Sequence, residues 1–142
     1  ERYKIRRKYW ESVLPSLQEA TGTFLNISPS KNNSIMGATA RSGVYLCCVA
    51  NYDSARVEIF IDQGDYQKNR AIYKRLEQNR DAIEAAYGKS LNWVCQDDVR
   101  ACKVYDEIKE VSIKNEEDRP VMSAFHIQRA KALLVATKQF LA

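Results

Sequence analysis

The residues best suited to nucleophilic or metal chemistry are four cysteines and a single histidine, namely Cys47, Cys48, Cys95, Cys102 and His126. A structural zinc site needs four ligands at characteristic spacings, and the chain contains no Cys-x-x-Cys pair. A cysteine–histidine nucleophile pair needs an accessible imidazole, but His126 lies between Phe125 and Ile127 in an amphipathic helical pattern. We therefore predict no metal, no cofactor, a histidine on the helix surface or at the edge of the core, and small buried thiols in a reduced, cytosolic protein.

Carboxylates on strand-like segments are the second set of candidates. One class of metal-dependent nucleases, which the order of the expected elements resembles, holds Mg²⁺ with carboxylates on neighbouring strands, near a lysine that supports the attacking water. Glu58 has Phe60 where that lysine would stand, and Asp53 is too near in sequence to be a convincing partner ligand. A Glu-x-Lys pair does occur at residues 107–109, but on a different expected strand. No catalytic motif is complete, so the sequence favours no enzymatic activity without excluding one.

Cations and small polar side chains could instead contact nucleic-acid phosphates. The net charge is +4, and the excess lies in residues 1–50, which hold seven Lys or Arg against three Asp or Glu. The rings of Tyr9 and Trp10 could stack on unpaired bases. The alternative interpretation of the basic cluster at residues 2–8 is a solvated helix end. The predicted contact residues are Arg6, Arg7, Lys8, Ser28, Ser30, Lys31, Asn32, Arg41 and Arg56.

The polar stretch "NISPSKNNS", residues 26–34, follows the first expected helix. Ser, Asn and Pro form local turns and side-chain to backbone hydrogen bonds, so the stretch could simply set the path of the chain. It could also be an anion-binding loop in which Lys31 and nearby Ser or Asn donors face phosphate. The sequence leaves both alternatives open.

The elements that must position these residues alternate between helices and strands. Apolar residues recur at helical spacing over residues 2–20, with Pro15 predicting a kink or an end and restart. Asp65 is a suitable N-cap and Gly88 a suitable C′ residue for one long helix. The expected elements are a helix at 2–20, strands at 34–40, 43–51 and 55–61, a helix at 65–87, strands at 91–96 and 101–113, and a last helix from 118.

This order, α-β-β-β-α-β-β-α, predicts an α+β fold in which an antiparallel β-meander and two further strands pack against three helices. A chain of 142 residues is normally one domain, and no apolar run approaches the ~20 residues that span a bilayer. We expect a single cytoplasmic domain over residues 1–142, with no membrane partner. Because the chain begins without Met, we expect a fragment or C-terminal domain of a longer protein.

A set of short motifs follows in order from the polar stretch to residue 93. They fall on Ser28, Ser30, Lys31, Arg56, Val57, Glu58, Ile61, Asp62, Asn69, Leu76, Ile83, Glu84, Gly88, Leu91 and Trp93, with Tyr9-Trp10 in the first helix. The set resembles the prokaryotic domain of unknown function 4268 family. Two positions depart from its pattern, because Ile35 stands where the family often has an aromatic residue and Arg119 where it often has Trp.

The resemblance implies a domain that occurs alone or at the C-terminus of larger prokaryotic proteins, some with a nuclease-like domain. It carries no established activity. The order helix, three strands, helix, strand also resembles the core of PD-(D/E)XK nucleases, which is why Glu58 is retained as a candidate ligand.

Three function hypotheses follow. The first is an accessory module that binds DNA or RNA for a fused or separate nuclease-like domain, and it predicts strongly salt-dependent binding. The second is a protein-interaction or homo-oligomerisation module with a salt-tolerant apolar interface. The third is a divergent metal-dependent nuclease whose activity needs Mg²⁺ or Mn²⁺ and is lost in Glu58→Ala.

Overall fold

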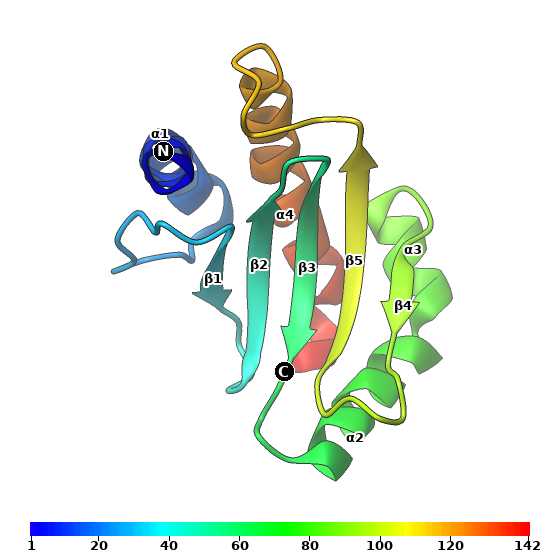
Figure 1. Ribbon diagram of the computed structural model, residues 1–142. Coiled ribbons are helices and arrows are strands. Elements are labelled where there is room, and N and C mark those ends of the chain that lie inside the picture. Colours follow the sequence, from blue (N-terminus) through cyan, green and yellow to red (C-terminus); the bar gives the residue numbers. More distant parts are fainter.

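The computed structural model describes residues 1–142 and contains four helices and one five-stranded antiparallel sheet (Figure 1). The strand order is β1-β2-β3-β5-β4, so the first three strands form the expected meander. The α+β class is confirmed. The elements are α1 (Arg2–Thr21), β1 (Ser34–Ala38), β2 (Val44–Ala50), β3 (Ser54–Ile61), α2 (Tyr66–Gln78), α3 (Arg80–Tyr87), β4 (Asn92–Val94), β5 (Cys102–Lys109) and α4 (Arg119–Leu141).

The helix expected over residues 65–87 is two helices, because the backbone leaves the helical conformation at Asn79, with φ −109° and ψ 21°. The Asn79 side chain donates a 2.8 Å hydrogen bond to the carbonyl of Arg75. Asn side chains compete with the backbone in this way and favour helix ends. The prediction of three helices is therefore wrong. Asp65 and Gly88 are confirmed as the N-cap of α2 and the C-cap of α3.

α1 continues through Pro15, where the sequence predicted a kink or an end and restart. Pro15 faces solvent, while Val13, Leu14 and Leu17 are buried against the rest of the protein. Packing of this apolar face outweighs the backbone hydrogen bond that proline removes.

One face of the sheet carries the helices and the core, and the opposite face carries no helix (Figure 1). Leu46, Ile59 and Val104 lie side by side on the covered face and are fully buried. Because successive strand residues point to opposite faces, Glu58 and Tyr105 are neighbours on the uncovered face. None of the four helices is long and apolar enough to cross a membrane.

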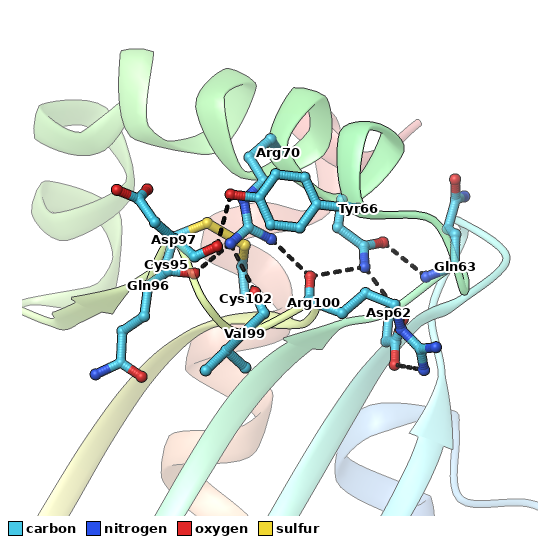
Figure 2. The surroundings of a disulfide bond; sticks show 11 residues. Asp62, Gln63, Tyr66, Arg70, Cys95, Gln96, Asp97, Val99, Arg100 and Cys102 are labelled. Atoms are coloured by element: carbon cyan, nitrogen blue, oxygen red, sulfur yellow. Dashed lines mark hydrogen bonds and ion pairs between the residues drawn. A yellow bond between two sulfur atoms is a disulfide. The ribbon is translucent and has the colours of Figure 1, made fainter.

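The hairpin between β4 and β5 is closed by a disulfide bond and held by α2 (Figure 2). Strand pairing brings the Cα atoms of Cys95 and Cys102 to 4.5 Å, so the prediction of reduced thiols is wrong for this pair. Cys47 and Cys48 are free and buried, as expected. The guanidinium of Arg70 donates hydrogen bonds to the carbonyls of hairpin residues 96, 99 and 100. These contacts fix the hairpin against the start of α2.

Candidate functional site

Two exposed tyrosines, surrounded by cations, lie where four separate segments of the chain meet. We call this surface the basic tyrosine patch. It draws on the start of α1, the polar loop before β1, the β2–β3 turn and the β5–α4 loop. Its residues are Arg2, Tyr3, Arg6, Lys31, Tyr52 and Lys114.

Each tyrosine ring of the patch has two cations near its centroid. The Arg2 guanidinium carbon lies 5.0 Å from the Tyr3 ring, and Lys31 Nζ lies 5.6 Å from it. Arg6 and Lys114 approach the Tyr52 ring to 5.7 Å and 5.1 Å. These distances allow cation–π attraction. The rings stay accessible, with Tyr3 48% and Tyr52 42% exposed.

The positive charge of the patch is not neutralised by the protein. None of its four cations belongs to any of the five ion pairs in the structure. Arg6 Nε is buried and has no hydrogen-bond partner. A hydrogen bond from the Arg2 guanidinium lowers the pKa of the Tyr3 hydroxyl, because a neighbouring cation favours the ionised form.

The polar loop has a structural part and an exposed part. Trp10 Nε1 donates a 3.0 Å hydrogen bond to the Asn32 carbonyl, and Ser30 Oγ accepts one of 2.9 Å from the Asn32 backbone N–H. Ser30 and Asn32 therefore set the path of the loop, as the structural alternative predicted. Ser28 is exposed on the same loop. Lys31 extends from the loop to the Tyr3 ring and belongs to the patch.

The structure does not bring all the predicted contact residues together. Arg41 lies in the β1–β2 turn, at the opposite end of the sheet from the β2–β3 turn (Figure 1). Arg56 lies on the uncovered sheet face, where its Nε donates a 2.7 Å bond to Glu107. Arg7 and Lys8 are exposed on α1 but outside the patch. Of the predicted contact residues, the structure therefore places only Arg6 and Lys31 in the patch.

The aromatic residues of the patch were not those expected. Tyr9 and Trp10 are buried, so they are core residues and cannot stack on a ligand. Tyr3 is exposed about two helical turns before them on α1, while Tyr52 is exposed in the turn between β2 and β3. For Tyr52, the one local signal in the sequence was an aromatic residue within a turn. Exposed turns seldom need a large ring for packing, so such a ring indicates a binding role. No local feature of the sequence indicated that Lys114 belongs to the patch.

The candidate nuclease ligands lie on the uncovered face. Glu58 and Glu107 are on the neighbouring strands β3 and β5, and both form ion pairs with Arg56, at 3.5 and 2.7 Å. The guanidinium of Arg56 therefore compensates these two carboxylates. The structure contains no group of three His, Cys, Asp or Glu side chains placed to hold a metal ion.

His126 is fully buried, whereas the sequence predicted a histidine on the helix surface or at the edge of the core. Its Nδ1 accepts a 2.6 Å hydrogen bond from the Tyr9 hydroxyl, and its Nε2 donates one of 2.9 Å to the Val49 carbonyl. Burial lowers its pKa to about 4, so the ring is neutral near pH 7. Burial also raises the pKa of the Cys47 and Cys48 thiols, which makes both poor nucleophiles.

We expect the free energy of unfolding to fall by about 2 kcal/mol between pH 7 and pH 5 through His126. The unfolded state takes up a proton near the ordinary pKa of 6.5, whereas the folded state does so only near pKa 4. The contribution of His126 to stability is therefore fully present above the pKa of the unfolded state. It is lost as the pH falls toward the pKa of the folded state. Asp62, whose pKa is lowered to about 2 by its hydrogen bond from Arg100, acts only below this window.

Urea unfolding at several pH values measures this effect, with His126→Gln as the control. The variant has a lower stability throughout, but its stability changes little between pH 7 and pH 5. An equal slope in both proteins would show that another group causes the dependence.

Comparison with known proteins gives one match. A protein-family model with the description Domain of unknown function (DUF4268) matches residues 5–141. No curated protein and no solved structure matches the chain. Because the match covers nearly the whole sequence, the chain belongs to the DUF4268 family, as the order of its motifs predicted.

Proposed function

We propose that this domain binds nucleic acid, with a preference for an unpaired strand, through the basic tyrosine patch. In this proposal it is the accessory module of a cytoplasmic, DNA-acting prokaryotic protein, such as one with a nuclease-like domain. The observation that supports it most is the placement of two exposed tyrosine rings between four cations that have no carboxylate partner.

The chemistry of the patch suits a single strand for two reasons. Cations attract the phosphate backbone irrespective of base sequence. Exposed aromatic rings stack on bases, and each such stack is worth about 1–3 kcal/mol. A duplex hides the faces of its bases, so it can use the cations but not the rings of Tyr3 and Tyr52.

The proposal predicts that Arg6→Ala/Lys31→Ala weakens the binding of a labelled single-stranded oligonucleotide by at least about tenfold at low salt. Fluorescence anisotropy over a range of salt concentrations measures this. Loss of two phosphate contacts lowers the slope of log affinity against log salt by about 1.4. We expect the wild type to bind DNA or RNA single strands more tightly than a duplex of the same length.

The matched control removes two cations from the opposite end of the molecule. Arg41→Ala/Lys68→Ala has the same net charge as the test variant, and both residues lie away from the patch. It should keep near wild-type affinity. Equal losses in the two variants would indicate general charge attraction, and no binding at low salt would overturn the proposal. Mg²⁺-dependent cleavage that is absent in Glu58→Ala would support the nuclease alternative instead.

A protein-interaction or oligomerisation module is the second candidate. The observation that favours it is a pair of exposed valines on α4, Val121 and Val135. Such contacts are apolar and tolerate salt. Sedimentation of the domain at high salt tests this candidate, because self-association there cannot come from the patch.

A further inference from the structure

A hollow lies between α1 and the start of α4, beside the patch. Its volume is about 680 Å³, which is in the range of small-ligand sites. One wall is a face of α1 that includes Lys4, Lys8 and Ser12, and the opposite wall includes Arg119 and Ser123. Figure 1 shows the first turns of both helices at the same end of the molecule.

The side chains of this hollow favour an anion. Lys4 and Lys8 are one helical turn apart, so both project from the same face of α1, and neither belongs to an ion pair. The Arg119 guanidinium adds a third positive charge, and its Nε is fixed by a 2.7 Å bond to the Ile113 carbonyl. Glu116 is the one acidic residue in the lining. Three cations against one carboxylate leave the hollow positively charged.

The hydroxyl groups of the hollow contribute less than the cations. Ser12 Oγ donates its hydrogen to the Tyr9 carbonyl, and Ser123 Oγ donates to the Pro120 carbonyl. Both hydroxyls are therefore already in use as donors. Recognition in this hollow would depend on charge, and removal of the two lysines is the direct way to test it.

The hollow and the patch draw on two of the same segments of the chain. α1 supplies Arg6 to the patch and Lys8 to the hollow, and the β5–α4 loop supplies Lys114 to the patch and Glu116 to the hollow. The residues of the two sites are therefore close in sequence on both segments.

We propose that the hollow binds the terminal phosphate of the strand that the patch holds, an inference that rests on the proposed function. A terminal phosphomonoester carries nearly two negative charges at neutral pH, whereas each internal phosphate carries one. A cluster of three cations therefore binds the terminal phosphate of a nucleic-acid strand more tightly than an internal one. A terminal phosphate is bonded to one sugar, whereas an internal phosphate is bonded to two. The terminal group therefore fits more easily into a hollow that has walls on both sides.

The experiment compares three single-stranded oligonucleotides of one sequence, with a 5′-phosphate, a 3′-phosphate or hydroxyls at both ends, each labelled internally. We expect one of the phosphorylated forms to bind the wild type about fivefold more tightly than the hydroxyl form. The double variant Lys4→Ala/Lys8→Ala should lose this preference. Arg7→Ala/Lys131→Ala, which removes two exposed cations outside the hollow, should keep it.

Equal affinity of the three oligonucleotides for the wild type would overturn the inference, as would a preference that survives in Lys4→Ala/Lys8→Ala. If the hydroxyl form binds and Arg6→Ala/Lys31→Ala weakens it, the proposed function stands while the terminal-phosphate site falls. If none of the three oligonucleotides binds, both are overturned.

Discussion

Trp10→Ala is expected to lower the free energy of unfolding by about 4 kcal/mol. The Trp10 side chain is fully buried, and its ring centroid lies 5.0 Å from that of Tyr9 and 5.6 Å from that of His126. The substitution leaves a large cavity between α1, α4 and the sheet. It also removes the hydrogen bond to the Asn32 carbonyl, so the polar loop loses its link to α1.

Trp10→Phe is the matched control, because it keeps an aromatic ring and removes only the indole N–H and part of the volume. We expect it to cost about 1–2 kcal/mol. Urea unfolding followed by circular dichroism measures both variants. A loss below about 2 kcal/mol in Trp10→Ala would contradict the prediction and would show that the core closes around the missing ring.

The Trp10 variants also connect stability to the candidate site. Trp10 holds Asn32, and the next residue in the chain, Lys31, lies over the Tyr3 ring. Release of the loop should therefore weaken oligonucleotide binding even under conditions in which Trp10→Phe remains folded. Unchanged binding by folded Trp10→Phe would mean that the loop keeps its position without this hydrogen bond.

Asn69→Leu is expected to lower the free energy of unfolding by about 3 kcal/mol. Asn69 is fully buried at the start of α2, and its side chain makes three hydrogen bonds. It accepts from the Gln63 N–H at 2.7 Å, and it donates to Asp62 Oδ1 and the Arg100 carbonyl at 3.1 Å. Leucine has a similar size but satisfies none of these groups, and unsatisfied buried polar groups are costly.

Gln67→Ala is the control for this second prediction, because Gln67 is exposed on the same helix. We expect a change within about 0.5 kcal/mol. The same unfolding measurement compares the two variants. If Asn69→Leu were as stable as Gln67→Ala, the other contacts of the hairpin, including those of Arg70 and Tyr66, would suffice to hold it.

The sequence predicted most of the fold because the relevant signals are local. Alternating apolar residues marked β3, and a nearly continuous apolar run marked β2. Asp65 and Gly88 marked helix ends because each residue can adopt the required cap conformation without tertiary help. The helix break at Asn79 escaped prediction because the apolar spacing continues across it from Leu76 to Ile83.

The candidate site was predicted only in part, because its residues meet through packing. Arg6 and Lys31 were expected from charge, but nothing local joins Lys114 to Tyr52 or Lys31 to Tyr3. The Cys95–Cys102 disulfide bond likewise depends on the register of the β4–β5 hairpin, which the spacing of the cysteines does not specify.

By itself, the sequence determined the order of the elements, the family and the excess of positive charge at the N-terminal end, since these depend on neighbouring residues. Only the tertiary structure decided which cations have a carboxylate partner and which do not. Arg56 is neutralised by carboxylates on its own and a neighbouring strand, whereas Arg6 lies over Tyr52 with no carboxylate partner. The physical reason is that a charge is compensated by whatever lies within a few ångströms in space, and strand pairing and helix docking set those distances.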